Sequence, residues 1–448
     1  MSPFGKVMAV HFFKPATMKS FLLVILFASL PIFAQQKPVN FRINQERLEK
    51  RILDLATYGM LPNGETNRVA FSDADVAAHQ FVMEMMQEAG LEVHIDAAGN
   101  LIGNRVGKKT LKPIVFGSHI DMVPHGGNYD GCVGAMGAIE VIKTLSEKNF
   151  TTDHPLQVII FTNEEGGLVG SRAISGNLKA TGLGVKNSTG FTIEEGIKRL
   201  GGNPENIASV ARKQGEMAAF IELHIEQGAK LDESDIQIGI VEGIVGIKWW
   251  DVTFEGFANH AGTTAMNNRK DALLAAAKFI QAVNEVAIQT PGNHVATVGR
   301  IQALPGAPNV IPGKVVLSLE IRDLSSEKIE TIFDSVEAKA TEISKQSGVS
   351  VGFSPIDATS SPALTDPVIK TAIQKASERL GYTFQYMPSG AGHDAQDMAL
   401  VVPTGMIFVP SKDGISHSPK EYTSPEDMAN GTNVLMHNIL ELDKKLKN

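Results

Sequence analysis

The sequence of 448 residues contains one cysteine, Cys132, so no disulfide bond can form within the chain. It has no Lys/Arg-rich run that would build a basic face, and its formal net charge is −8 at pH 7. Nucleic acid is therefore excluded as the main partner. Internal repeats and low-complexity tracts are also absent. The hydrophobic fraction of 43% indicates a globular protein of two or three domains.

Long apolar runs are scarce too, and the most pronounced one lies at the N-terminus. Residues 21–34 read FLLVILFASLPIFA and follow three lysines with no acidic residue. A membrane-spanning helix needs about 20 apolar residues, so this run is too short. The pattern predicts a secretory signal peptide over residues 1–34, cleaved near Ala34, and hence an exported, periplasmic or secreted protein without stable membrane insertion. An uncleaved anchor is the alternative, and Met18 is an alternative start.

The rest of the chain predicts two kinds of sheet. Strand, helix and strand alternate in PIVFGSHID, GAMGAIEVIKTL and LQVIIFTNEE, which indicates a buried parallel sheet. From residue 246 the order becomes β-α-β-β-α-β, which is typical of a small antiparallel sheet with two helices on one face. We therefore predict an α/β fold with a mostly parallel central sheet. The main domain covers residues 40–245 and 357–448, and a ferredoxin-like α+β domain is inserted at 246–356.

Local signals predict where helices begin and end. Ser72 and Asp75 form a capping-box pattern before an apolar stripe, and Gly90 ends that helix. A T-x-x-E pattern at Thr192 begins a helical excursion within the polar, Gly-rich segment 183–217. Residues 357–366 are predicted to be the linker that returns to the main domain.

Polar residues follow the first strand of the predicted main sheet. His119 and Asp121 stand two residues apart, which places both side chains on one face. His119 can offer a ring nitrogen to a metal ion, and Asp121 can hold the proton of the other ring nitrogen. Asp130 lies in the Gly-rich turn GGNYDG, where a carboxylate is free to bridge two cations.

Other strand ends add further ligand types. Glu164 and Glu165 are adjacent and point opposite ways, so one can bind metal while the other acts as a general base on water. A third strand ends in His224, and the C-terminal segment FVPSKDGISHSP adds His417. Each motif alone also suits a solvated strand end, but together they suit Zn²⁺ or another borderline divalent ion. Two such ions, bridged by one acid, would polarise a carbonyl and activate water.

Six motifs carry a family resemblance, in the family's order: GSHIDMVPHGGNYDG, FTNEEG, HIEQG, FANHAGTT, SGAGHDAQ and HSPKEYT. They resemble the M20 family of metallopeptidases and amidohydrolases, more narrowly its amidase/hydantoinase–carbamoylase branch. That branch includes N-carbamoyl-L-amino acid hydrolases, allantoate amidohydrolases and β-ureidopropionases. The resemblance runs from about residue 40 to the end. It implies hydrolysis of the C–N bond of N-carbamoyl-L-amino acids or related ureido or linear amide compounds. A dipeptidase or aminoacylase of the same family is the alternative.

The resemblance also implies the roles of the polar residues. Asp130 is implied as the bridge and Glu164 as the general base, with Asp121 beside them. His224 stands where dipeptidases and aminoacylases typically have Asp, which favours the carbamoylase branch. We expect two divalent ions per subunit, Zn²⁺ first, with Mn²⁺, Co²⁺ or Ni²⁺ as alternatives. The implied metal ligands are His119, Asp130, Glu165, His224 and His417.

A small substrate with a free carboxylate is the expected partner. Arg322 can hold a carboxylate with its two-pronged guanidinium, although a surface ion pair is the alternative for this residue alone. His260 is implied to stabilise the oxyanion. The inserted domain is implied to close over the site as a lid and to form a homodimer. A protein of this fold that only binds a ligand would lack a metal ligand or the base, and none is missing. The implied substrate contacts are Gln227, His260, Asn309, Arg322, Gly392 and His393.

Overall fold

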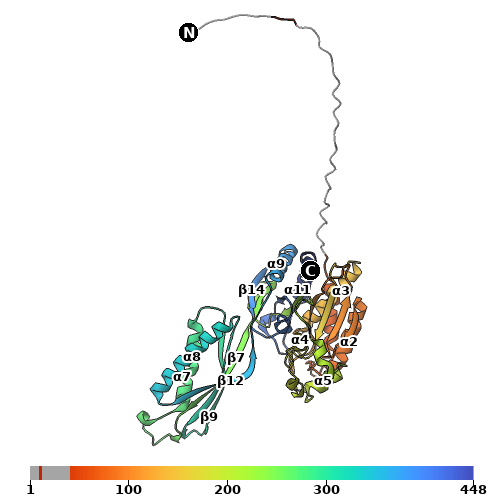
Figure 1. Ribbon diagram of the computed structural model, residues 1–448. Coiled ribbons are helices and arrows are strands. Elements are labelled where there is room, and N and C mark those ends of the chain that lie inside the picture. Colours follow the sequence, from red (N-terminus) through yellow and green to blue (C-terminus); the bar gives the residue numbers. More distant parts are fainter. Residues whose placement is uncertain (1–9, 13–40, 447–448) are drawn as a thin grey trace, which may run out of the picture. The chain divides into compact units, whose positions relative to one another are not determined.

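The computed structural model describes residues 10–12 and 41–446 (Figure 1). The chain divides into two units, Met1–Phe41 and Arg42–Asn448, and the helices and strands described belong to the second. The predicted signal peptide lies outside the described residues except for residues 10–12, and it stays a prediction. Within the part that the structure describes, no helix is both long and apolar enough to cross a membrane.

The larger sheet has nine strands in the order β1-β2-β4-β3-β5-β15-β6-β13, with β14 paired to β6. Its central strands β4, β3, β5 and β15 run parallel and are fully buried, in accordance with their continuous apolar sequences. The outer pairs β1–β2, β2–β4 and β6–β13 are antiparallel. The bounds are β1 Glu92–Ile95, β2 Leu101–Arg105, β3 Ile114–His119, β4 Leu156–Phe161, β5 Ala219–Ile225, β6 Ile238–Ile244, β13 Ala363–Leu364, β14 Phe384–Ser389 and β15 Thr404–Val409.

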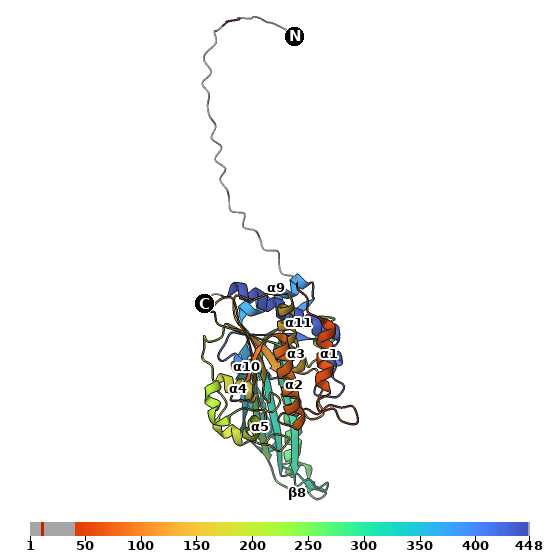
Figure 2. The ribbon, with the colours of Figure 1, turned by 90° about the vertical axis from the view of Figure 1, so that its right-hand side faces the viewer.

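Helices cover both faces of this sheet. On one face α3 packs on β3 and β5 and contacts α1, α2 and α11, as Figure 2 shows. On the other face α4 and α10 pack together over apolar side chains of the same strands. The α-helices are α1 Gln45–Ala56, α2 Asp73–Ala89, α3 Cys132–Glu147, α4 Val169–Ser175, α5 Ile193–Arg199, α6 Lys230–Glu233, α9 Pro367–Leu380, α10 Asp394–Met398 and α11 Pro425–Lys445. Short 3-10 turns are η1 Ala180–Gly184, η2 Pro204–Val210 and η4 Lys412–Gly414.

The smaller sheet belongs to an inserted unit, residues 246–360. Its four antiparallel strands have the order β12-β7-β11-β9, and α7 and α8 pack side by side against it over a separate apolar core (Figure 1). The predicted β-α-β-β-α-β order and the α/β class are confirmed. The elements are β7 Gly246–Glu255, β8 Asn259–His260, η3 Met266–Asn268, α7 Ala272–Gln289, β9 Val295–Leu304, β10 Val310–Ile311, β11 Lys314–Asp323, α8 Ser326–Ser347 and β12 Ser350–Ser360.

Helix caps follow the predicted signals with one difference. The Ser72 hydroxyl accepts from the Asp75 backbone N–H, and Gly90 ends α2 with φ 101°. The Asp75 carboxylate does not return to Ser72, because it accepts from the Phe71 N–H at 2.7 Å instead. The capping box at Thr192 is complete.

The two connections between the sheets run side by side. A Cβ at Gly246 would lie 2.5 Å from Pro362, so the outgoing and returning chains touch there. The Gln396 amide donates to the carbonyls of Val245 at 3.3 Å and Ser361 at 2.9 Å and so joins both connections. The predicted linker 357–366 is therefore partly strand, because β12 extends to Ser360 and β13 pairs with β6.

Candidate metal centre

The carboxyl edge of the larger sheet collects the predicted ligands from five places. In a parallel sheet this edge carries the loops that bind ligands. Strand ends and the turns beside them supply the side chains: His119 ends β3, Glu164 and Glu165 follow β4, His224 lies on β5, Asp130 precedes α3 and His417 lies between η4 and α11.

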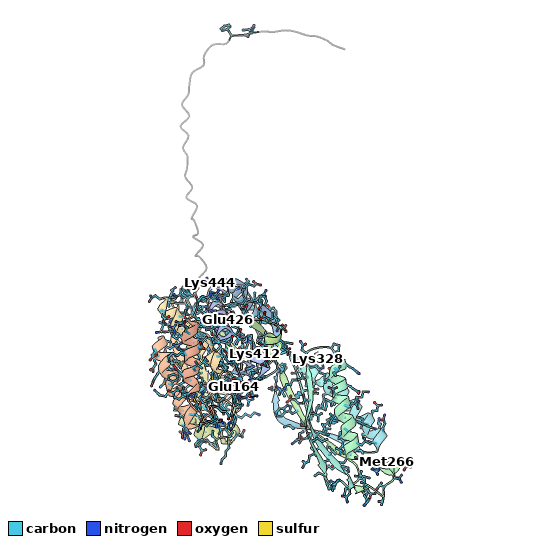
Figure 3. All side chains as sticks on the ribbon, turned by 180° about the vertical axis from the view of Figure 1, so that it is seen from behind. Glu164, Met266, Lys328, Lys412, Glu426 and Lys444 are labelled. Carbon is cyan, nitrogen blue, oxygen red and sulfur yellow. The ribbon has the colours of Figure 1, made fainter. Side chains whose placement is uncertain are left out.

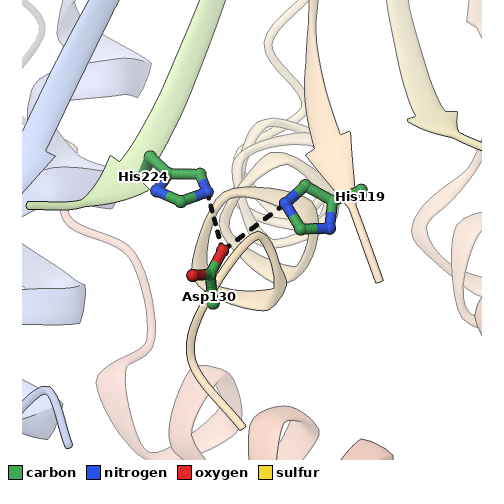
Figure 4. Close-up of side chains that lie close together, drawn as sticks. All are labelled: His119, Asp130 and His224. Carbon is green, nitrogen blue, oxygen red and sulfur yellow. Dashed lines mark ion pairs between the residues drawn. The ribbon is translucent and has the colours of Figure 1, made fainter. Parts of the chain in front are cut away.

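A first group of possible ligands gathers on one oxygen of Asp130. The His224 Nε2 lies 3.1 Å from Asp130 Oδ1, and the His119 Nε2 lies 3.6 Å from the same oxygen (Figure 4). All three side chains are buried, and their ligand atoms lie within 4.8 Å of one another. This spacing suits one cation held by two imidazoles and a carboxylate.

A second group gathers on the other oxygen of Asp130. The His417 Nε2 lies 3.4 Å from Asp130 Oδ2 and 3.5 Å from Glu165 Oε1. These three residues also offer ligand atoms within 4.8 Å of one another. Asp130 therefore faces one group with each oxygen, which is the geometry of a bridging carboxylate.

Hydrogen bonds fix how the two strand-borne imidazoles face the centre. The Nδ1 of His119 lies 3.1 Å from the Asp121 carbonyl oxygen, and the Nδ1 of His224 lies 2.9 Å from that of Ile225. A carbonyl only accepts, so each Nδ1 carries its proton and each Nε2 faces Asp130. The His119 Nε2 and the Glu165 Oε1 are buried without a hydrogen-bond partner. Buried polar atoms of this kind call for a partner, and a cation fits them.

The backbone around the centre adopts strained conformations. Asn163, Gln227 and His417 have positive φ values of 50°, 59° and 54°. Gly131 has φ 63°, and a Cβ there would lie 2.4 Å from the His119 ring. Glycine at this position lets the turn approach the imidazole, and the other three residues carry the strain that is common at functional sites.

The carboxyl groups and imidazoles shift one another's proton affinity. Burial opposes the ionisation of Asp130, but the surrounding imidazoles, His224 foremost, outweigh it and hold the pKa of Asp130 well below its ordinary value. Burial raises the pKa of Glu165 to about 7, and a hydrogen bond to Asp130 raises the pKa of His417 to about 9. Burial also raises the pKa of Glu164 well above its ordinary value. The cluster thus attracts positive charge, which a divalent cation would supply.

Asp121 lies beside the ligands but makes a different contact from the one predicted. Its carboxylate accepts from the backbone N–H groups of Glu164 at 3.1 Å and Glu165 at 3.2 Å. The carboxylate is 3.7 Å from the His119 Nδ1, whose closer partner is the Asp121 carbonyl. The carboxylate is engaged by the turn after β4, so Asp121 orients the two glutamates as well as the imidazole.

Two predicted substrate contacts lie against the ligands. The Gln227 Nε2 donates to Asp130 Oδ2 at 2.6 Å and lies 3.3 Å from the His417 Nε2. The His393 ring centroid is 4.4 Å from that of His224, and its Nε2 lies 2.9 Å from the Ser389 hydroxyl. His393 is buried and its ring packs against the ring of His224. Gly392 lies in the same loop and is exposed.

The other predicted substrate contacts belong to the inserted unit. The ladder of β8 and β10 places His260 opposite Val310, next to Asn309, and both predicted residues are exposed. The Arg322 guanidinium donates to the Glu320 carboxylate and, at 2.7 Å, to the Gly390 carbonyl. Among the described residues, no hydrogen bond or ion pair joins these three predicted contacts to the five ligands.

Cavities offer limited room beside the ligands. A cavity of about 280 Å³ is lined by Asp121, Asn163 and Glu165, together with apolar side chains such as Met122. A larger cavity of about 800 Å³ contains none of the predicted site residues.

Several residues that support the predicted ligands were not predicted from the sequence. Glu222 is fully buried and accepts from the Ser118 hydroxyl at 2.8 Å and the Ala395 N–H at 2.9 Å. It forms a third group of possible ligands with His224 and His393. Its position two residues before His224 on one strand face was the signal that could have found it. Others missed are Ser416 and Glu421, each inside or beside a quoted motif.

Two ligand groups that share a carboxylate at the edge of a mixed sheet are the arrangement of a metal-dependent hydrolase. Residues 115–441 match the sequence profile of peptidase family M20/M25/M40, and the chain belongs to that family. This family is metal-dependent.

Relatives with a named activity indicate which kind of metal-dependent hydrolase this chain resembles. The chain is 40% identical over 406 residues to an N-carbamoyl-L-amino acid amidohydrolase of Geobacillus stearothermophilus, covering 89% of this chain and 99% of the relative. It is 33% identical over 395 residues to an allantoate amidohydrolase of Bacillus subtilis, covering 87% and 95%. A hydantoinase/carbamoylase family amidase structure from Burkholderia multivorans has a TM-score of 0.83 at 35% identity, covering 90% and 98%. The predicted family, its amidase branch and the class of hydrolase are confirmed.

Proposed function

We propose that this protein cleaves the C–N bond of a small ureido compound with a free carboxylate, such as an N-carbamoyl-L-amino acid, or of a related linear amide. One observation carries the proposal: Asp130 presents Oδ1 to His119 and His224, and Oδ2 to His417. The names of the relatives support the substrate class. A dipeptidase or aminoacylase is the competing candidate within the family.

We infer two divalent cations per chain, Zn²⁺ first and Mn²⁺, Co²⁺ or Ni²⁺ as alternatives. Imidazoles and carboxylates are the donors that such ions select. The partnerless His119 Nε2 and Glu165 Oε1 fit that assignment. When bound, a pair of cations bridged by one carboxylate supplies Lewis acidity toward a carbonyl and lowers the pKa of water.

Glu164 is the proposed general base. Its carboxylate lies 3.8 Å from the His119 Nε2, and only 9% of the residue is exposed. Figure 3 labels it within the unit of the larger sheet. Burial raises its pKa, which makes the carboxylate a stronger base toward the attacking water, and the proton can then pass to the leaving nitrogen. Asp121 holds the turn that carries this carboxylate.

His260 is the proposed donor to the oxyanion. Its Nδ1 accepts from the backbone N–H groups of Gly262 at 3.0 Å and Thr263 at 3.2 Å. The proton of the neutral ring therefore lies on Nε2, which can donate to a developing negative oxygen. Because His260 belongs to the inserted unit, this role requires that unit to close over the metal centre.

Arg322 and Asn309 are the proposed partners of the substrate carboxylate, and Gln227 is a further proposed substrate contact. The Arg322 Nε donates to Glu320 at 2.7 Å and its Nη1 to the Gly390 carbonyl at 2.7 Å. A guanidinium has five N–H groups, so N–H groups of both terminal nitrogens remain for a carboxylate. Glu320 thereby orients the side chain without using all its donors.

We also propose that the protein forms a homodimer through the inserted unit. The outer strand β9 and helix α7 expose apolar side chains, among them Leu274 at 55%, Ile288 at 76% and Val295 at 51%. An exposed edge strand with apolar neighbours favours pairing with a second copy. Light scattering on the purified protein tests the dimer.

We also propose export by the N-terminal segment. N-terminal sequencing of secreted protein tests cleavage near Ala34.

A substrate panel tests the proposed activity. Ammonia release is measured with N-carbamoyl-L-amino acids and allantoate, and amino acid release with N-acetyl amino acids and dipeptides, alongside metal analysis of the same sample. We expect turnover of the ureido acids that chelators abolish and added metal restores. Turnover of dipeptides or N-acetyl amino acids alone would favour the competing candidate.

A further inference from the structure

Three of the five predicted ligands lie on loops outside the sheet. His119 and His224 belong to strands whose ladders fix their positions, whereas Asp130 and His417 lie in turns. Glu165 lies in the turn after β4, so all three members of the second ligand group, Asp130, Glu165 and His417, lie on loops. Something other than strand pairing must hold these loops together.

One buried carboxylate, that of Glu421, binds the turn that carries Asp130. Its Oε1 accepts from the backbone N–H groups of Tyr129 at 2.9 Å and Asp130 at 3.0 Å. The turn comes so close that a Cβ at Gly127 would lie 2.1 Å from this oxygen. Glycine at that position is therefore needed for the contact.

The second oxygen of the same carboxylate binds the loop that carries His417. Glu421 Oε2 accepts from the Ser416 hydroxyl at 2.8 Å and from the His417 N–H at 3.3 Å. The Ser416 hydroxyl also lies 3.1 Å from Asp130 Oδ2. A hydroxyl has one hydrogen to donate, so it serves either Glu421 or the bridging carboxylate at a given moment.

We propose that Glu421 is a positioning residue that sets the distance between Asp130 and His417 and so builds the second of the two cation positions. Only 5% of Glu421 is exposed, and in the described chain no lysine or arginine forms an ion pair with it. Its hydrogen bonds instead join two loops, the turn that carries Asp130 and the loop that carries His417. This inference rests on the proposed two-cation function.

The two cation positions depend on Glu421 to different extents. The first position keeps His119 and His224 on their strands, and Asp130 is also anchored by the start of α3 through the Val133 N–H to Tyr129 carbonyl bond at 3.0 Å. Among the described residues, no helix or strand gives His417 a second support of this kind. Loss of the Glu421 carboxylate should therefore weaken cation binding at the second position and leave cation binding at the first unchanged.

Titration of the metal-free full chain with Zn²⁺ tests this inference. The wild type should bind two ions, and Glu421→Gln should keep one at unchanged affinity while the other weakens by about 10- to 100-fold, the usual effect of losing a residue that orients a ligand. The thermal stabilisation by Zn²⁺ should fall in parallel. Ser416→Ala should weaken the same ion by a smaller factor, which keeps the inference testable if Glu421→Gln does not fold.

Asp443→Asn is the matched control. The Asp443 carboxylate also holds a loop, since one oxygen accepts from the Asp153 N–H at 3.0 Å and the other from the His154 N–H at 2.7 Å. Among the described residues, it forms no hydrogen bond or ion pair with a predicted ligand. It should lower the melting temperature and leave both ions unchanged. Two unchanged ions in Glu421→Gln and Ser416→Ala would overturn the role of Glu421 alone. A wild type that binds fewer than two ions would overturn the proposed function with it.

Discussion

At the scale of the residue, three neighbouring carboxyl groups differ because their surroundings differ. Asp130 stays ionised since imidazoles surround it, and the pKa of Asp130 lies well below its ordinary value. Burial raises the pKa of Glu165 to about 7 and that of Glu164 well above its ordinary value. A bridging ligand, a terminal ligand and a base need such different proton affinities.

The base can be separated from the ligands by one substitution. Glu164→Gln should keep both metal ions and lose turnover by about 10²-fold or more, because the amide cannot accept the proton of water. Metal analysis and initial rates on the same preparation check this. Glu165→Gln is the contrast, since it should lose one ion. Full turnover in Glu164→Gln would remove Glu164 from the role.

Metal binding should depend on pH with a definite sign. His417 holds a proton below its pKa of about 9, and Glu165 holds one below about 7, so a cation at their position must displace protons. Affinity for Mn²⁺ should therefore rise as pH rises from about 6 to about 9, with release of protons measurable by calorimetry in two buffers. His417→Gln should flatten the upper part of this dependence. An affinity independent of pH would contradict the assignment.

At the scale of the element, the turn into α3 brings the bridging carboxylate against β3. Gly131 has φ 63°, and its missing side chain leaves room for the His119 ring. Gly131→Ala should therefore lose metal binding as well as stability, because the added Cβ pushes the imidazole away. Gly381→Ala is the control, since φ is 78° there and no atom lies within 4 Å of the added Cβ.

The outcome for the two glycine variants is read from metal content and melting temperature. Gly381→Ala should lower stability by about 1–3 kcal/mol through backbone strain alone and keep both ions. If Gly131→Ala also kept both ions, the contact between the turn and the imidazole would not shape the site.

At this scale, the buried strands and the polar residues at their ends could be predicted from the sequence. Continuous apolar runs predicted the buried strands, and the polar residues after them predicted which side chains would meet at one edge. The structure does bring His119, Asp130 and His224 together. Their roles as ligands stay predictions.

Contacts between loops could not be predicted in the same way. Glu421 acts on Asp130 across 291 positions of the chain, and neither a period nor a spacing links the two residues. The Asp121 carboxylate was predicted to face an imidazole, but no pattern in the sequence indicated that it also accepts from two N–H groups in the turn after β4. Within the predicted linker 357–366, the pairing of Ala363 and Leu364 with β6 was likewise not indicated by the sequence.

At the scale of the whole molecule, the proposed reaction needs residues of both sheets. Arg322 on β11 already reaches the Gly390 carbonyl in the loop that carries His393. Arg322→Lys should raise KM for a carboxylate substrate by about 10- to 100-fold, with a smaller change in kcat, because a lysine cannot form the two-pronged contact.

Steady-state kinetics with a substrate and its amide analogue check this prediction. The analogue lacks the charge, so its KM should change little in Arg322→Lys. Arg300→Lys on the neighbouring strand β9, where the arginine pairs with Asp251, should leave both KM values unchanged. Equal effects on the two substrates would show that Arg322 does not hold the carboxylate.

The central claim is that the two oxygens of Asp130 hold two cations. Anomalous diffraction at the absorption edge of the bound metal, on crystals of the metal-loaded protein, tests it most directly. We expect two peaks about 3.5–4 Å apart. One should lie among His119, His224 and Asp130 Oδ1, and the other against Asp130 Oδ2, Glu165 and His417. A single peak, or peaks away from Asp130, would contradict it.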